Sequence, residues 1–137
     1  MFSTLLFLML AVPPACPVTR PPIDPFPLNI VLQKYGTSEL WVTIPLNGEG
    51  IKSMTIFGGR DGYDARKEVV PRLSFAGKCL EESIPLPAVT TNGMKGDLDF
   101  MVSHVSFPET GCWDVTVHYI DPQLRSHELN FTIFIRH

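Results

Sequence analysis

The sequence predicts an all-β protein, an immunoglobulin-like antiparallel β-sandwich of about seven to eight strands behind an N-terminal signal segment. Three observations support this prediction. Apolar and polar residues alternate through the last part of the chain, which is the period of a strand with one buried face. Turn residues separate the short apolar segments. After the leader, no segment longer than about ten residues has apolar positions at helical spacing, so essentially no helix is expected.

The first fifteen residues are predicted to be a signal peptide. Residues 2–12 form an apolar run, and the first charged side chain is Arg20. A helix that spans a bilayer needs about 20 apolar residues, whereas a run of this length is typical of a secretory signal, although no Lys or Arg precedes it. We therefore expect an extracytoplasmic protein. An N-terminal strand or buried helix is the alternative.

Cys16 distinguishes two models of processing. In the first, a lipoprotein signal peptidase cleaves before Cys16 and the thiol receives a lipid, which tethers the protein to a membrane. Ala15 suits the preceding position, but Pro13 and Pro14 stand where a leucine-like residue and a small residue are usual. In the second, an ordinary signal peptidase cleaves nearby. The sequence favours a cell-envelope lipoprotein and leaves free secretion open.

Residues 16–27 are predicted to form a proline-rich linker. Between Pro13 and Pro27 lie seven of the 13 prolines of the chain. Such a segment has few backbone donors and favours an extended polyproline conformation. It is either a semi-rigid stalk between a membrane anchor and the folded domain or a disordered leader of the mature protein.

The folded domain is predicted to span residues 28–137, about the length of an immunoglobulin-like domain. Strands are expected near residues 28–32, 38–44, 51–57, 68–75, 83–89, 97–107, 111–120 and 126–136. Turn residues separate them at 35–38, 47–50, 58–62 and 91–93.

The last two strands are predicted most clearly, as a hairpin. Apolar residues alternate along both segments: Trp113, Val115, Val117 and Tyr119, then Leu129, Phe131, Ile133 and Ile135. The connection between the two segments is polar and has a proline after its first residue, as expected of a hairpin loop.

Within 97–107 the apolar residues change parity. Leu98, Phe100 and Val102 share one face, and Val105 and Phe107 follow on the other. A β-bulge at position 103 or 104 would restore the register. A strand that is buried on both faces, or that turns a corner between sheets, is the favoured interpretation.

Composition and motifs exclude several functions. The net charge of -3 and the pI near 5.7 give no electrostatic case for binding nucleic acid, which would need a basic face, and the lysines and arginines are scattered. The sequence contains no nucleophile elbow, zinc-protease motif or phosphate loop. We therefore expect a protein that is not an enzyme and has no cofactor. Asp97 and Asp99, and the glycine-rich segment 58–64, fit a solvated sheet face and a surface loop. Weak calcium or carbohydrate contact is the alternative for the loop.

The cysteines offer a candidate crosslink. In an oxidising compartment Cys79 and Cys112 are expected to form a disulfide. Their separation of 33 residues corresponds to ~3.7 kcal/mol of stabilisation by the chain-entropy relation. The alternative is that both are buried free thiols.

Two histidines are weak candidates for a metal site. His118 and His127 lie on the predicted hairpin partners, and with a third ligand they could hold zinc or copper. Exposed histidines without a metal are the favoured interpretation, because no cluster of Cys or carboxylate residues accompanies them.

The segments KYGTSELWVTIP and FPETGCWDVTVHY, within residues 34–45 and 107–134, resemble a family of uncharacterised bacterial secreted proteins and lipoproteins. In that family a Tyr-Gly segment precedes a Leu-Trp-Val strand, and a Phe-Pro-x-x-Gly-Cys-Trp-x-Val-Thr block leads into a final hairpin. The tryptophan-rich middle of the family is absent here, since residues 51–68 contain no Trp. The resemblance implies an extracytoplasmic β-sandwich and no particular activity.

These observations together predict a membrane-tethered, non-enzymatic binding or accessory module with a protein or glycan partner at the cell envelope. A partner strand could pair with an exposed sheet edge, and Trp41 or Tyr63 could contact a sugar. The alternative function is a small periplasmic metal-binding protein that uses His118 and His127. A minor hydrolase is a third hypothesis, because one fold hosts many functions.

Overall fold

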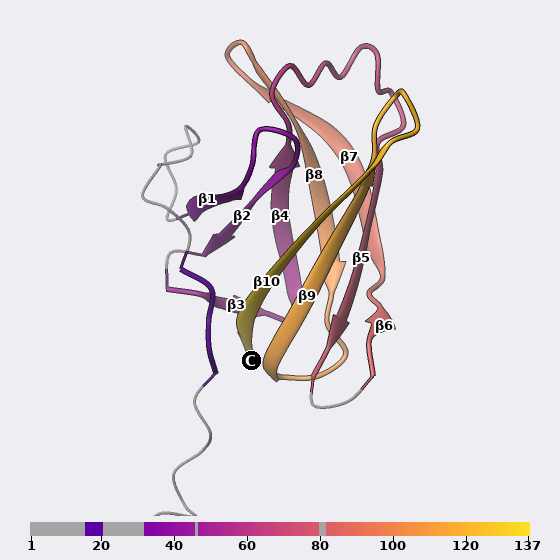
Figure 1. Cartoon of the computed structure of the whole chain (residues 1–137). Coiled ribbons are helices and arrows are strands. Elements are labelled where there is room, and N and C mark those ends of the chain that lie inside the picture. Colours follow the sequence, from indigo (N-terminus) through magenta and orange to yellow (C-terminus); the bar gives the residue numbers. More distant parts are fainter. Residues whose placement is uncertain (1–15, 21–31, 46, 80–81) are drawn as a thin grey trace, which may run out of the picture.

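The computed structural model describes residues 16–20, 32–45, 47–79 and 82–137. Within these ranges the protein has ten strands in two five-stranded sheets that pack face to face, and no helix (Figure 1). No helix in the described part is therefore long and apolar enough to cross a bilayer. The predicted signal peptide, residues 1–15, lies outside the described residues.

Each sheet mixes strands from distant parts of the sequence. The first sheet has the order β1 (Leu32–Gly36), β2 (Trp41–Pro45), β4 (Ser53–Gly59), β8 (Leu98–Ser106) and β7 (Ala88–Lys95). The second has the order β3 (Glu49–Ile51), β10 (Ser126–Arg136), β9 (Gly111–Ile120), β5 (Arg72–Lys78) and β6 (Ile84–Pro85). Neighbours are antiparallel except β3 and β10. The all-β sandwich is confirmed, and an immunoglobulin-like connectivity stays a prediction.

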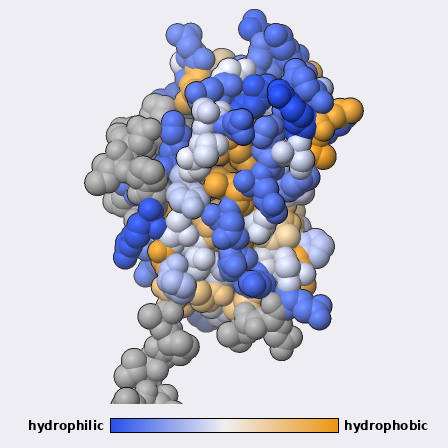
Figure 2. Space-filling view, in the orientation of Figure 1, coloured by the Kyte–Doolittle hydropathy of each residue, from blue (hydrophilic) through white to orange (hydrophobic). Residues whose placement is uncertain are grey.

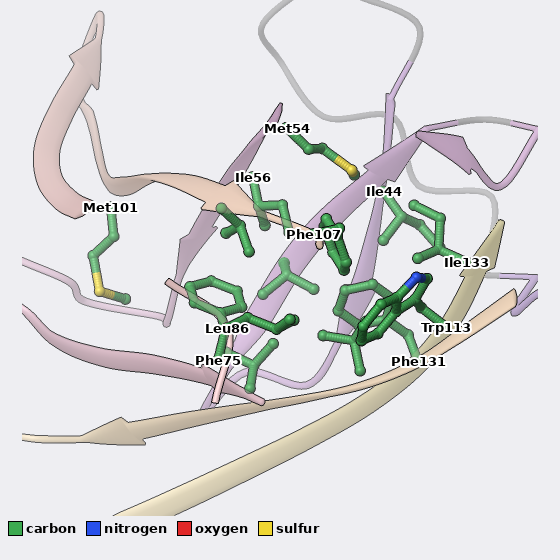
Figure 3. Close-up of a cluster of buried hydrophobic side chains, with 14 of the residues drawn as sticks. Ile44, Met54, Ile56, Phe75, Leu86, Met101, Phe107, Trp113, Phe131 and Ile133 are labelled. Atoms are coloured by element: carbon green, nitrogen blue, oxygen red, sulfur yellow. The ribbon is translucent and has the colours of Figure 1, made fainter. Parts of the chain in front are cut away.

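The C-terminal hairpin forms as predicted. Strands β9 and β10 have the expected bounds, and Val117 lies opposite Leu129 in their register. Every second side chain of β9 from Trp113 onward is buried. Figure 3 shows Trp113, Phe131 and Ile133 in the core with Ile44 and Ile56 of the first sheet. Full burial of an aliphatic or aromatic side chain stabilises by about 1.5 to 3 kcal/mol, so each side chain buried at this interface contributes substantially to the stability of the fold.

Strand β8 is apolar on both faces and has no bulge. Its pairing with β4 and β7 is continuous, so the favoured interpretation of a strand buried on both faces is confirmed and the alternative of a bulge at position 103 or 104 is wrong. Met101 and Val105 belong to the core between the sheets, whereas Phe100 packs with Trp41 on the other face. This second cluster, with Phe57, Leu98 and Val102 at its margin, explains the change of parity.

Two other expectations at strand ends differ from the structure. The predicted turn at 91–93 lies inside β7, where Asn92 pairs with Met101, and the chain reverses instead around Gly96, which has a φ of 60°. Cross-strand pairing therefore overrides the local turn preference of Asn-Gly. The first strand among the described residues, Leu32–Gly36, covers part of the turn expected at 35–38, and the strand expected at 28–32 lies outside the described part except for its last residue.

The disulfide differs from the predicted one. Cys112 bonds to Cys16, with Cα atoms 5.6 Å apart, and Cys79 is a free thiol. Trp113 faces the core, so Cys112 faces outward, whereas Cys79 packs against the core on the inner face. The predicted Cys79–Cys112 pair is therefore wrong, because the two side chains leave opposite faces of the sheet.

The disulfide also corrects the lipid prediction. A sulfur atom in a disulfide cannot carry a lipid thioether, so Cys16 is not a lipid anchor in this structure. Residues 16–20, expected to start a free linker, lie against β10: the Thr19 N–H donates to the Thr132 carbonyl at 3.0 Å, and the Thr132 N–H donates to Thr19 Oγ1 at 2.7 Å. The remainder of the predicted linker, residues 21–27, lies outside the described part.

We predict that reduction of the Cys16–Cys112 bond destabilises the protein strongly. The bond spans 96 residues, and the chain-entropy relation gives about 4.7 kcal/mol for a loop of this size. Urea unfolding with and without reductant measures the change, and peptide mapping identifies the pair. Cys79→Ser is the control and should leave the reductant-sensitive step intact. A crosslinked peptide that contains Cys79 would contradict the assignment.

Candidate functional site

One end of the sandwich carries three connections that lie together, and we call it the loop end. It consists of residues 60–71 between β4 and β5, residues 96–97 between β7 and β8, and residues 121–125 between β9 and β10. Figure 1 shows these segments at the top of the molecule. Residues 60–71 form the longest connection among the described residues. Long ordered connections without regular structure frequently carry function.

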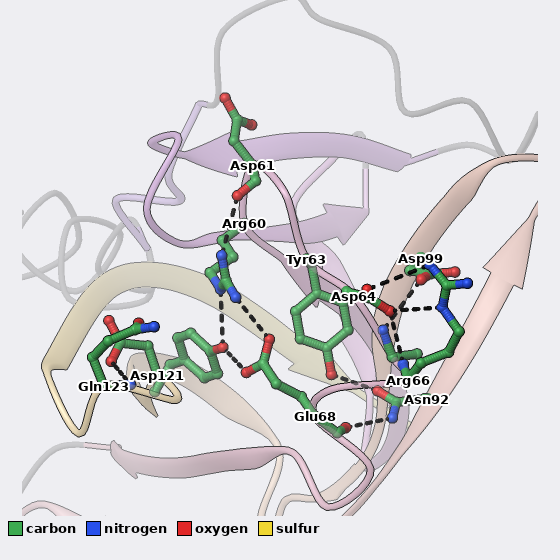
Figure 4. Close-up of polar contacts among 12 residues, drawn as sticks. Arg60, Asp61, Tyr63, Asp64, Arg66, Glu68, Asn92, Asp99, Asp121 and Gln123 are labelled. Carbon is green, nitrogen blue, oxygen red and sulfur yellow. Dashed lines mark hydrogen bonds and ion pairs between the residues drawn. The ribbon is translucent and has the colours of Figure 1, made fainter.

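A buried polar cluster ties the long connection to the second sheet. The Tyr119 hydroxyl donates to Glu68 Oε1, Arg60 Nε donates to the Tyr119 oxygen at 3.2 Å, and Arg60 Nη2 donates to Glu68 Oε2 at 2.9 Å (Figure 4). Tyr119 is fully buried and Glu68 is 8% exposed. Burial, and then the hydrogen bond to Glu68, raise the pKa of Tyr119 to about 12. The hydroxyl therefore keeps its proton at neutral pH and acts as a donor.

The same connection is bonded to the first sheet. The Tyr63 hydroxyl donates to Asn92 Oδ1 at 2.5 Å, and Asn92 Nδ2 donates to the Glu68 carbonyl at 2.7 Å. Asp99 Oδ2 accepts the Ala65 N–H at 3.1 Å. Burial raises the pKa of Tyr63 above its ordinary value, so this hydroxyl also stays protonated. The connection is thus held by strands of both sheets.

Asp121 organises the β9–β10 loop in a similar way. Its Oδ1 accepts the N–H groups of Gln123 and Arg125, both at 2.9 Å, and its Oδ2 accepts from His127 Nε2 at 2.9 Å. The hydrogen bond from His127 is the main reason that the pKa of Asp121 falls to about 2. The His127 ring stacks on Tyr119, with centroids 6.0 Å apart. The loop and the buried cluster therefore form one continuous polar network.

Clefts open between the three connections. One of about 540 Å³ is lined by Arg66, Asn92, Met94, Asp97 and Asp99, among others. A second, of about 360 Å³, lies between the long connection and the β9–β10 loop.

Trp41 and Tyr63, the predicted sugar contacts, line a third cleft but are mostly enclosed. Trp41 is 5% exposed, with the Lys34 ammonium 5.6 Å from its ring centroid, and Tyr63 is 7% exposed. Neither ring therefore offers an open face for stacking on a sugar. Asp97 is exposed and Asp99 is bonded to the long connection.

The two candidate metal ligands are not brought together. Tyr119 pairs with His127 and both face inward, whereas His118 faces outward and hydrogen-bonds to Ser126. A one-residue offset places neighbouring side chains on opposite faces of a strand. Among the described residues no group of three or more His, Cys, Asp or Glu side chains could hold a metal ion. The weak alternative of a metal site on His118 and His127 therefore gains no support from this geometry.

Sequence reasoning missed the buried network itself. Arg60 and Glu68 are separated from Tyr119 by more than 50 residues, and no motif joins them. The available signal was the alternation in β9, which places Tyr119 inward, where a hydroxyl needs a partner. Comparisons of the chain with protein-family models, with curated proteins and with solved structures found no match.

We predict that Tyr119→Phe lowers the free energy of unfolding by about 1.5 to 3 kcal/mol, because hydrogen bonds to charged groups contribute this much. Urea unfolding measures the loss, and proteolysis of the 60–71 connection should become faster. Tyr35→Phe makes the same change on β1, outside the network, and should have a smaller effect. Equal losses in the two variants would show that the Tyr119 hydroxyl has no special role.

We predict that Asp121 stabilises the fold in a pH-dependent way. Its pKa is lower in the folded protein than its ordinary value of 3.8, so the unfolded chain binds more protons between the two values. Its contribution is therefore complete above about pH 5 and is lost as the pH falls from about 4 toward 2. The difference in unfolding midpoint between the wild type and Asp121→Asn should shrink over that range. A constant difference from pH 6 to pH 2 would refute this.

Proposed function

We propose that the protein is a non-enzymatic binding or accessory module that works outside the cytoplasm and contacts its partner through the loop end. The Cys16–Cys112 disulfide indicates an oxidising, extracytoplasmic environment. Free secretion or attachment to the cell envelope is compatible with that environment. Because the Cys16 sulfur is used in the disulfide, attachment has to come from another part of the protein.

The fixed conformation of residues 60–71 is the observation that carries this proposal. Arg60 and Glu68 bond to β9, and Tyr63 and Ala65 bond to side chains of β7 and β8. A loop that is ordered before binding loses less conformational freedom when a partner arrives. Rigid scaffolds that present such loops are a common arrangement of binding proteins.

The protonation behaviour of the network favours binding over catalysis. A general acid or base works best when its pKa is close to the pH of the reaction. Tyr119, with a pKa of about 12, and Asp121, with a pKa of about 2, are both far from neutrality. Their hydrogen-bonding capacity is directed at Glu68, His127 and the loop backbone. These groups therefore serve the shape of the loop end.

The experiment is sedimentation with envelope fragments of the source cells, which contain membrane, polymers and integral proteins. The double variant Val69→Ser and Val70→Ser alters the exposed tip of the long connection, and surface changes of this kind usually alter stability by less than ~0.5 kcal/mol. Val89→Ser changes a similarly exposed valine at the start of β7, away from the loop end.

We predict that the wild type and Val89→Ser sediment with the fragments and that the double variant binds at least about tenfold more weakly, because burial of one aliphatic side chain contributes about 1.5 kcal/mol or more. Equal sedimentation of all three proteins, or none, would remove the loop end as the binding surface. Turnover of envelope peptides or glycans by the purified protein would contradict a non-enzymatic role.

A further inference from the structure

We propose that the loop end inserts Val69, Val70 and Leu124 into the interface of an anionic phospholipid bilayer, with basic side chains around them on the lipid headgroups. This inference rests on the proposed function and names the partner of the same surface. It assigns to the loop end the membrane attachment that Cys16 does not provide.

The apolar residues are exposed to an unusual degree for their type. Val69, Val70 and Leu124 are 73%, 80% and 70% exposed. They come from two different connections, yet all three line the one cleft between the long connection and the β9–β10 loop, so they are neighbours. In Figure 2 an orange projection stands out at the upper right of the molecule, where Figure 1 places the β9–β10 loop. Clustered exposed aliphatic residues mark interaction surfaces.

Leu124 is held outward by the fold. It has a φ of 62°, a conformation that residues other than glycine adopt rarely and at a cost. The Leu124 N–H donates to the Asp121 carbonyl at 2.9 Å, and the Asp121 carboxylate fixes the N–H groups on either side. The buried carboxylate of Asp121 therefore holds the backbone of Leu124 in a strained conformation. In this conformation the aliphatic side chain of Leu124 points into solvent.

The charge presented around these residues is positive. Lys67, Arg72 and Arg125 are exposed at the loop end. The two acidic residues that line the same cleft are buried: Glu68 is paired with Arg60, and Asp121 is paired with His127 and, at 3.4 Å, with Arg125. The exposed acids of the loop end, Asp61 and Asp97, do not line this cleft, so Lys67 and Arg72 are the unburied charges that border the apolar residues there. Basic residues around an apolar contact are the arrangement that anionic lipid surfaces attract.

The residue types favour a lipid surface over a protein partner. Protein interfaces take most of their binding energy from Trp, Tyr and Arg, and Val and Leu are under-represented among such residues. The exposed large apolar residues of the tip, Val69, Val70 and Leu124, are all aliphatic and are carried on loops and not on a flat sheet face. The disulfide lies at the opposite end of β9, so it does not obstruct a membrane at the loop end.

The test uses the disulfide-containing protein and vesicles of phosphatidylcholine alone or mixed with phosphatidylglycerol. We expect sedimentation with the mixed vesicles that weakens as salt is raised. Since one basic residue near an anionic surface contributes a factor of about five in partitioning, Lys67→Ser and Arg72→Ser should each lower binding by about that factor. Lys78→Ser, at the far end of β5, should not.

Insertion has its own readout. Val70→Trp places an indole at the tip, while the native Trp41 and Trp113 are buried and provide a constant background. The emission of this indole should shift to shorter wavelength on mixed vesicles and be quenched by brominated lipid. In the sedimentation assay, the Val69→Ser, Val70→Ser double variant should bind at least about fivefold less than Val89→Ser. Binding that depends on charge alone, with no spectral shift, would overturn insertion.

The outcomes separate this inference from the proposed function. No binding to anionic vesicles, together with envelope sedimentation that still depends on Val69 and Val70, would replace the lipid by a protein or glycan partner. Loss of both kinds of binding would overturn the inference and the loop end as a binding surface together.

Discussion

The loop end depends on a buried carboxylate that must keep its partners. Glu68 lies between two partners. Tyr119 is on β9, and Arg60 is the residue that follows β4. Glu68 is buried while the Arg60 side chain is 24% exposed, so loss of a partner leaves a buried carboxylate without compensation and costs at most the ~3 to 5 kcal/mol typical of a fully buried pair. The long connection therefore cannot move away from the sheets without exposing or unpairing this group. The penalty for separation, more than any net gain from the pair, fixes the loop.

Strand β9 links this constraint to the rest of the sandwich. It lies between β10 and β5 in the second sheet, so both of its edges are paired. Its first residues carry the disulfide to Cys16, its middle residues fill the core, and Tyr119 near its end supports the loops. A residue with paired neighbours on both sides has little freedom to shift. The position of the Tyr119 hydroxyl is thus set by the same packing that stabilises the fold.

The parts of this structure that follow from local pattern could be predicted from the sequence, and the parts set by distant contacts could not. The alternation in β9 and β10 gave their bounds and inward faces. The same alternation argues against the Cys79–Cys112 pair, because a buried Trp113 places the Cys112 side chain on the outer face of the sheet. The two-sided burial of β8 depends on Trp41, and the Glu68 pairing depends on residues far along the chain. Neither contact leaves a motif in the sequence, because the residues involved have to be close in space and not along the chain.

Polarity at the loop end is inverted with respect to the rest of the protein. Glu68 and Asp121 point inward and are buried, while Val69, Val70 and Leu124, next to them in sequence, point into solvent. Exposed aliphatic residues leave apolar surface in water, and buried carboxylates have a desolvation cost that their hydrogen bonds and ion pairs must offset. The inversion is consistent with a surface whose apolar residues are buried by something other than the protein itself, and the buried acids are what hold that surface in place.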